Sequence, residues 1–434
     1  MMRTPPKRHR RLLRAGAAGA VAALLTLSGC GGSDSADGKT TIRFSWWGDD
    51  GRAATTKSVI ADFEKANPDI KVETETSDFE SYFDKLATET AAGDAPDLMT
   101  LGGAYPREYS DRGALLDLKT VSDELDLSKF PAATLSAAKF SGTLYGAPTG
   151  GNAIAMITNP AVFKAAHVPL PDTKSWTWEQ FADIANKITD NSPKGTYGFE
   201  PRVIDTLGVY AGQRGTPIFD AKGELGVQES TVQDYFSMEK DLLKGGGIPS
   251  AETIQEVGSA APEQTLMGRG KAGMSIIYSN LLGAFNQAAG GGLKLVTIPG
   301  EHQYKQPGTT VLPSQYYSIS AKSAHPEAAA KLLDYLINSP AAGRKILDDR
   351  GLPFSPEVKA AITGSLDSAG RANADYVDQV SHNGAPAAPD PPAGGSSLND
   401  ITSKLDSDVL FGRKTPEAAA KEWVAQMKQA LDSA

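Results

Sequence analysis

The stretch Thr41–Trp47, TIRFSWW, is an apolar, β-branched and aromatic run that stops at a Gly/Asp cluster, Gly48–Gly51. Such a run predicts a buried strand, and the cluster after it predicts a loop. The next segment, 55–68, spaces its apolar residues three and four apart and stops at Pro68. The folded part of the chain is therefore expected to open with a strand, a loop and a helix.

The same strand-then-helix order repeats along the chain. Further strands are expected at 70–76, 97–101 and 272–280, and further helices at 82–93, 108–118, 178–188, 324–340 and 416–431. Four alternations within about 80 residues are typical of βαβ units on a mostly parallel sheet. The sequence therefore predicts an α/β fold.

Length and charge narrow the classes of function. The chain has 434 residues with 43 basic and 52 acidic side chains, and residues 1–29 hold six basic and no acidic ones. Without that segment 37 basic residues face 52 acidic ones, a net charge of about −15. Nucleic acid is then a poor partner, because phosphates bind basic surfaces. About 400 residues suffice for two domains or two intertwined lobes.

Cys30 is the only cysteine, which excludes an internal disulfide and any paired-cysteine metal or redox site. It follows a basic segment and an apolar run, 15–27, in the layout of a secretory signal peptide. The residues Leu27–Cys30, LSGC, resemble a bacterial lipobox, in which the signal peptide 1–29 is removed and Cys30 is lipidated. The alternative is a cysteine that lies beside an ordinary cleavage site.

Residues 30–40 are mostly small and polar, and we expect them to form a flexible tether. After residue 29 no run approaches the ~20 apolar residues that a membrane span needs. The sequence therefore predicts contact with the membrane through the lipid anchor only.

Trp46, Trp47, Asp49 and Asp50 lie where the first strand ends. In open α/β sheets, ligands bind at the carboxyl ends of strands. Adjacent strand residues point to opposite faces, so one tryptophan belongs to the core and the other can meet a ligand. An indole can stack on the C–H face of a sugar ring, and carboxylates accept hydrogen bonds from its hydroxyls. The alternative is one buried tryptophan beside a turn built on Gly and Asp.

Further candidates follow the later strands and a Gly-rich crossing: Asp78, Phe79, Tyr105, Asn152, Tyr278 and Asn280. Each alone is explained equally well as a loop or core residue. Three aromatic or acidic groups at successive strand ends are a better argument for a site than any one of them.

The sequence contains no HExxH, GxSxG or Walker motif. Gly268–Gly273 matches GxGxxG, but a strand is expected after it rather than before it, the reverse of the dinucleotide-binding order. We therefore expect neither enzymatic activity nor a cofactor or metal. A carboxylate pair for glycoside cleavage is defined by spatial position, so a secreted, lipid-anchored glycoside hydrolase stays as an alternative.

Several blocks together resemble the family 1 extracellular solute-binding proteins, the sugar-binding lipoproteins of ABC importers. The most specific part is AAGDAPDLM (91–99) followed by GALLDL (113–118). The remaining blocks are the lipobox, IRFSWWGDD, VIADFEKANPDIKVE, YGAPTGGNAIAMITNP, GKAGMSIIYSN and AHPEAAAKLLDYLINSP. The resemblance extends over nearly the whole chain after residue 29.

This resemblance implies a periplasmic-binding-protein-like fold, in which two α/β lobes are joined by a hinge with a ligand cleft between them. One lobe would comprise 41–149 plus 293–338, and the other 150–292 plus 339–434. It also implies an extracytoplasmic monomer that is anchored to the cell membrane, binds a carbohydrate and delivers it to the permease subunits of an ABC importer.

The resemblance also suggests which residues contact the ligand. They are Asp49, Asp50, Ala104, Tyr105, Asn152, Tyr278 and the late loop around Gly395. Maltose-type relatives often have an acid and an arginine in place of Ala104 and Tyr105, which argues against maltodextrin as the ligand. A binding protein for a non-sugar solute, such as a peptide or polyamine, would share the fold and is a further alternative.

Overall fold

The computed structural model describes residues 38–433, except 104, 137, 141, 203–204, 221, 305 and 384–390. The expected signal peptide, Cys30 and most of the expected tether therefore lie outside the described residues. No helix among the described residues is long and apolar enough to cross a membrane.

The first lobe is built on a five-stranded sheet in the order β2-β1-β3-β12-β6. These strands are β1 (Thr40–Trp47), β2 (Ile70–Ser77), β3 (Leu98–Leu101), β6 (Ala147–Pro148) and β12 (Tyr316–Ile319). β1 pairs in parallel with β2 and β3, as the alternating pattern predicts, whereas β12 runs antiparallel to β3 and β6. A short hairpin of β4 (Lys139–Phe140) and β5 (Thr143–Leu144) lies outside the sheet.

Helices cover both faces of this sheet because apolar side chains alternate along β1. Ile42, Phe44 and Trp46 point to the face covered by α1 (Asp50–Ala66) and α11 (Pro326–Asn338). Trp47 points to the opposite face, where α2 and α3 pack. The helices of this lobe are α1, α2 (Phe79–Ala92), α3 (Tyr105–Asp111), α4 (Ala132–Ser136), α11, α12 (Pro340–Ile346) and α13 (Pro356–Thr363), with the 3₁₀ turn η1 (Leu118–Val121).

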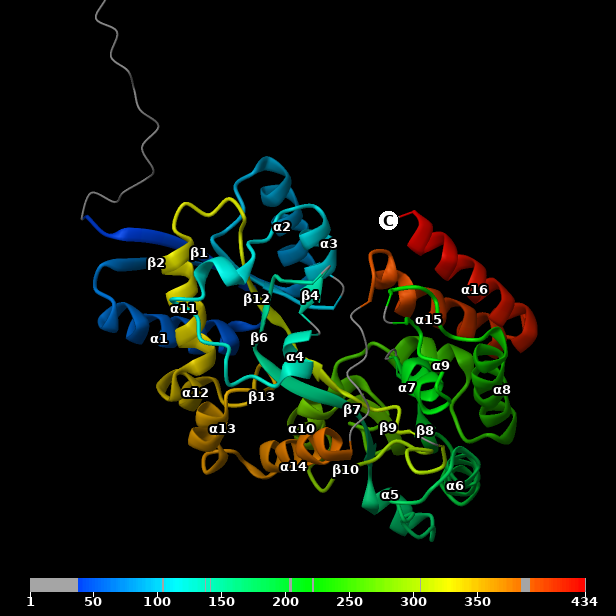
Figure 1. The fold of residues 1–434 in the computed structure, drawn as a ribbon. Helices are drawn as coiled ribbons and strands as arrows, with labels where there is room; N and C mark the ends of the chain where they lie inside the picture. Colours follow the sequence, from blue (N-terminus) through cyan, green and yellow to red (C-terminus); the bar gives the residue numbers. More distant parts are fainter. Residues whose placement is uncertain are drawn as a thin grey trace, which may run out of the picture.

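The second lobe is built on a sheet in the order β10-β7-β9-β8. Its strands are β7 (Gly150–Thr158), β8 (Tyr197–Glu200), β9 (Ala272–Tyr278) and β10 (Lys294–Val296), and β11 (Val311–Pro313) and β13 (Leu352–Pro353) pair with the start of β7. β9 begins at Ala272, at the end of the GxGxxG match, so the prediction that a strand follows the glycines is confirmed. Figure 1 shows the two sheets in separate lobes, with β7 leading from the hinge into the second lobe.

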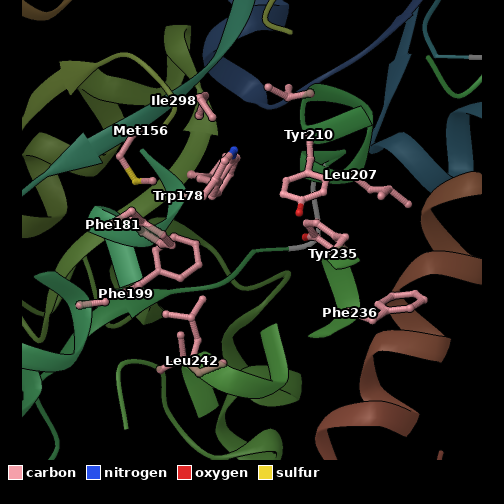
Figure 2. Packing of buried hydrophobic residues seen from close by; sticks show 14 of the residues in the cluster. Met156, Trp178, Phe181, Phe199, Leu207, Tyr210, Tyr235, Phe236, Leu242 and Ile298 are labelled. Atoms are coloured by element: carbon pink, nitrogen blue, oxygen red, sulfur yellow. The ribbon is translucent and has the colours of Figure 1, made fainter. Parts of the chain in front are cut away.

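The larger core of the second lobe lies on one face of this sheet. Figure 2 shows Trp178 and Phe181 facing Tyr210 and Tyr235 across it. A capping box between Thr177 and Gln180 starts the helix that carries Trp178. The helices of the lobe are α5 (Pro160–Ala165), α6 (Trp178–Asp190), α7 (Thr206–Gln213), α8 (Glu229–Gly245), α9 (Ala251–Val257), α10 (Leu282–Ala289), α14 (Ser368–Asn383), α15 (Leu398–Leu410) and α16 (Pro416–Asp432), with the 3₁₀ turns η2 (Pro262–Gln264), η3 (Ser279–Leu281) and η4 (Gly395–Ser397).

The hinge includes three close chain crossings, at 148–150, 313–316 and 350–352. Thr149 N–H donates to Gln315 O at 3.0 Å, and its hydroxyl donates to Arg350 O at 3.0 Å. The crossings are so close that a Cβ on Gly150 would lie 2.5 Å from Gly351 O. Glycine is therefore required here by the approach of one backbone to another.

The lobe boundaries differ from the predicted ones in two places. β10 and β11 were expected in the first lobe as part of 293–338, but both pair with β7 in the second lobe. α12 and α13 were expected in the second lobe, but Ala342 and Ile346 of α12 belong to the core that α1 and α11 form, and α13 packs on α12. Both errors arise because strand pairing and helix packing join segments that are distant in the sequence.

Candidate ligand-binding site

The topology places the ends of several strands opposite the second lobe. Leu101 at the end of β3 pairs with Tyr316 at the start of β12, and Tyr316 also pairs with Pro148 at the end of β6. The chain crosses to the second lobe after Pro148 and returns just before Tyr316. The carboxyl ends of β1 and β3 therefore lie at the end of the first sheet that faces the hinge, where ligands bind in open α/β sheets.

Four aromatic side chains gather at this end of the first sheet: Trp47, Phe79, Phe83 and Tyr105, which we call the aromatic cluster. Trp47 meets Phe79 edge-on, with ring centroids 5.4 Å apart, and Tyr105 stacks on Phe83 at 3.6 Å and 9°. Phe79 is 48% exposed although it is a large apolar residue. Trp47 lies over Gly102, where a Cβ would come within 3.1 Å of the indole. The rings thus support one another and leave an apolar surface exposed.

The structure brings together the predicted residues Trp47 and Tyr105, with Phe79 between them. Burial raises the pKa of Tyr105, so its hydroxyl is protonated at neutral pH and can donate a hydrogen bond. The ring supplies a flat face and the hydroxyl a polar group, a combination that suits an amphipathic ligand.

Two of the predicted acidic residues begin helices beside the aromatic cluster. Asp49 is the N-cap of α1 and accepts a hydrogen bond from Arg52 N–H at 2.8 Å. Asp78 is the N-cap of α2 and accepts from Ser81 N–H at 3.0 Å. Asp50 is exposed in the first turn of α1. Asp49 and Asp78 therefore stabilise helix starts whether or not they contact a ligand.

Trp46 is a correction to the predicted site. Its side chain is 1% exposed and packs against Phe44, with ring centroids 4.9 Å apart, in the core beneath α1 and α11. Because side chains alternate along β1, only Trp47 reaches the face of the aromatic cluster. Trp46 is a core residue and is removed from the set of candidate ligand contacts.

The candidates of the second lobe lie at the hinge end of its sheet. β7 begins just after the hinge, and its Ile154 pairs with Tyr278 at the end of β9. Asn152 is buried and its Nδ2 donates to Asn280 Oδ1 at 3.2 Å. Burial raises the pKa of Tyr278 to about 12, so this phenol is protonated too. These three residues lie at the hinge end of the second sheet, as the ends of β1 and β3 lie at the hinge end of the first.

Gly395 belongs neither to the aromatic cluster nor to the candidate residues at the hinge end of the second sheet. It is buried at the start of η4, and a Cβ there would lie 2.7 Å from Pro391 and 3.4 Å from Phe219. A side chain at position 395 would thus collide with the second lobe itself. The structure gives Gly395 a packing role in the described residues and provides no test of a ligand contact.

Sequence reasoning missed two residues near these groups. Phe83 is the stacking partner of Tyr105, and its position four residues after Phe79 on a helix was the available signal. Asp205 caps α7 by accepting from Gly208 N–H at 2.7 Å, and burial raises its pKa. Burial is the main cause of the raised pKa of Tyr278, and the charge of Asp205 adds to it, which places an acid near the end of β9.

The chemistry of these groups suits binding better than catalysis. They offer apolar ring faces, neutral amides and protonated phenols, with the carboxylates of Asp49 and Asp78 engaged at helix starts. In the part of the chain that the structure describes, no group of three or more His, Cys, Asp or Glu side chains could hold a metal ion. An arrangement of this kind can hold a hydroxylated molecule by stacking and hydrogen bonds.

Comparison with known proteins gives a consistent result. A model of the family described as bacterial extracellular solute-binding protein matches residues 47–343. A lipoprotein from Streptomyces antibioticus is 31% identical over 40% of this chain and 39% of its own length. The galactooligosaccharide-binding protein of Bacillus subtilis is 24% identical over 72% of this chain and 74% of its own. The structure of a family 1 extracellular solute-binding protein from Alicyclobacillus acidocaldarius is 28% identical, with a TM-score of 0.71, over 91% of this chain and 98% of its own.

Proposed function

Since the chain belongs to the family of bacterial extracellular solute-binding proteins, we propose that it is the substrate-binding component of an ABC importer and that its ligand is a sugar or oligosaccharide. It would bind the sugar between the lobes and deliver it unchanged to the membrane permease. The observation that carries this proposal is the aromatic cluster, whose Phe79 is 48% exposed at the end of the first sheet that faces the hinge.

A sugar suits the groups on the two lobes. The C–H faces of its rings match the exposed surfaces of Trp47 and Phe79, and its hydroxyls match the phenols and amides. The Asn152 and Asn280 amides already orient each other at 3.2 Å, so little side-chain entropy is lost when a ligand binds to them. The relative from Bacillus subtilis is named for galactooligosaccharide binding, which supports the same ligand class.

We propose that the sugar first rests on the aromatic cluster and that the second lobe then closes over it. A ligand drives closure only through contacts that are better in the closed state. Asn152, Tyr278 and Asn280 would supply those contacts, because they lie across the hinge from the aromatic cluster. The hinge permits such a motion without breaking either sheet, since the lobes are joined by short crossings.

Attachment to the membrane is proposed to occur through Cys30. Its sequence context resembles a lipobox, and the relative from Streptomyces antibioticus is named a lipoprotein. A single acyl chain anchors a protein only weakly, so stable attachment would need two or more chains on the modified residue.

A thermal-shift screen of residues 39–434 against mono- and oligosaccharides tests the proposal. A binding protein is stabilised by its ligand in proportion to the logarithm of ligand concentration over Kd, and the sugar should be recovered unaltered after long incubation. Stabilisation only by peptides or polyamines would refute the sugar, and cleavage of the sugar would favour the hydrolase.

A further inference from the structure

We propose that Arg52 is a further sugar-binding residue, and that its Nη1 donates hydrogen bonds to the hydroxyls of a neutral sugar ring. This role rests on the proposed function and names a group that recognises the hydroxyls. Arg52 lies in the first turn of α1, three residues after Asp49. It was not among the site residues predicted from the sequence.

The side chain of Arg52 lies between the end of β1 and the hinge. It passes over Gly48, the residue after Trp47, so closely that a Cβ on Gly48 would come within 2.4 Å of Arg52 Cδ. Its guanidinium reaches Asp349, which directly precedes the hinge crossing at 350–352. The guanidinium therefore lies at the hinge end of the first sheet, beside the loop that follows Trp47.

Asp349 holds the guanidinium in a fixed orientation. Arg52 Nε donates to Asp349 Oδ2 at 2.9 Å, and Nη2 donates to Oδ1 at 3.0 Å and to the backbone O at 3.1 Å. A bidentate pair of this kind fixes the plane of the guanidinium as well as its position. Little side-chain entropy is then lost when a ligand binds to Arg52.

The free donors of Nη1 are the observation that indicates a ligand. Nη1 makes no hydrogen bond with the described residues, whereas Nε and Nη2 are both engaged by Asp349. The Arg52 side chain is 22% exposed, and Nη1 is not among the buried atoms without a partner, so it is open to solvent. An arginine that is held by a carboxylate on one edge keeps two N–H donors on the other.

The charges around Arg52 favour a neutral sugar. Asp349 neutralises the guanidinium, and Asp49 and Asp50 add two carboxylates in the loop beside it. A ligand carboxylate or phosphate would therefore meet net negative charge. Sugar hydroxyls suit both kinds of group, because they accept from Nη1 and can donate to the exposed Asp50 carboxylate.

The test is isothermal titration calorimetry with the neutral disaccharides galactobiose, maltose and cellobiose, and with the anionic digalacturonate. Arg52→Met keeps the apolar stem over Gly48 but removes every side-chain donor. It should weaken the binding of the neutral disaccharide about tenfold or more, because hydrogen bonds to charged groups are the stronger kind. The matched control is Arg43→Met, which removes an arginine of the same lobe that pairs with Glu89 and Asp94 before β3. This control should bind like the wild type.

A double-mutant cycle tests Asp349 as the positioning residue of Arg52. Asp349→Asn should weaken binding about threefold in the otherwise wild-type protein, because the guanidinium is then less well oriented. In the Arg52→Met background the same substitution should have no further effect. A merely structural role of Asp349 would weaken binding in both backgrounds, and that result would refute the positioning.

Urea unfolding shows that each variant is folded at the assay temperature. If Arg52→Met bound the disaccharide like the wild type, or if Arg43→Met lost as much affinity, the role of Arg52 would be refuted while the proposed function stood. Tighter binding of digalacturonate than of galactobiose would refute the preference for a neutral sugar. If the wild type bound none of the neutral disaccharides, the role of Arg52 would also be refuted, whereas the wider thermal-shift screen would still decide the proposed function.

Discussion

Two adjacent tryptophans provide a matched pair of substitutions with opposite expected effects. Trp46 is 1% exposed within the core of the first lobe, so Trp46→Ala should cost about 3–5 kcal/mol of unfolding free energy. Trp47 is half-buried in the aromatic cluster and meets Phe79 and Phe83 at 5.4 and 5.5 Å. Because only part of its indole is buried, Trp47→Ala should cost about 1–2 kcal/mol of stability.

For ligand binding, we expect the larger effect from Trp47→Ala and the smaller effect from Trp46→Ala. Trp47→Ala removes a ring face that we expect the sugar to stack on, and should weaken binding by about 1–3 kcal/mol, roughly fivefold to 150-fold in Kd. Trp46→Ala should leave the Kd nearly unchanged wherever the protein is still folded, because its indole lies on the other face of the sheet.

Urea unfolding followed by circular dichroism measures the stability of the two variants, and isothermal titration calorimetry with the sugar found in the screen measures their binding. If Trp47→Ala bound like the wild type, or if Trp46→Ala lost affinity while still folded, the assignment of core and site to the two residues would be refuted.

Three further predictions follow from the second lobe and the hinge. Burial, together with the neighbouring Asp406 carboxyl, raises the pKa of Glu239 to about 8, and burial raises the pKa of Asp406 to about 7, so the contribution of this pair to stability is greatest in acid and is lost as the pH rises towards 8. Urea midpoints should fall between pH 5.5 and 8, and the double substitution Glu239→Gln with Asp406→Asn should flatten the dependence, whereas a parallel fall in that variant would contradict the cause. Gly351 has φ +83° and touches Gly150 across the hinge, so Gly351→Ala should lower the free energy of unfolding, measured in urea, by about 1–3 kcal/mol. Gly364 has φ −71° and open space around it, so Gly364→Ala should be nearly neutral, and equal effects of the two substitutions would count against hinge strain. Asn152→Ala removes the donor to Asn280 and should weaken sugar binding by about 1–2 kcal/mol by calorimetry; unchanged affinity would remove Asn152 from the site.

The sequence was sufficient to predict the first three strands of the first lobe and the helices between them, because their order follows local patterns. The run Thr41–Trp47 alternates between core and opposite face, and β1, β2 and β3 pair as that alternation requires. The sequence also predicted aromatic groups at successive strand ends, and the structure brings Trp47, Phe79 and Tyr105 into contact. That they bind a ligand stays a prediction.

The pairing of segments that are distant along the chain could not be predicted from the sequence. β10 joins the second sheet because Leu295 pairs with Ile157, 138 positions earlier, and no local pattern specifies that partner. Similarly, alternation indicates that one tryptophan of the pair is core, but which one depends on the helices that pack on each face. Gly395 was proposed by resemblance alone, and its burial beside Phe219 depends on a contact between distant segments.

The central claim is that a sugar is held between two lobes that close on it, and small-angle X-ray scattering of the chain with and without saturating sugar tests this most directly. The account predicts a smaller radius of gyration in the presence of the sugar, and a loss of that change in Trp47→Ala at the same sugar concentration. An identical radius of gyration for the free and the saturated protein would contradict it.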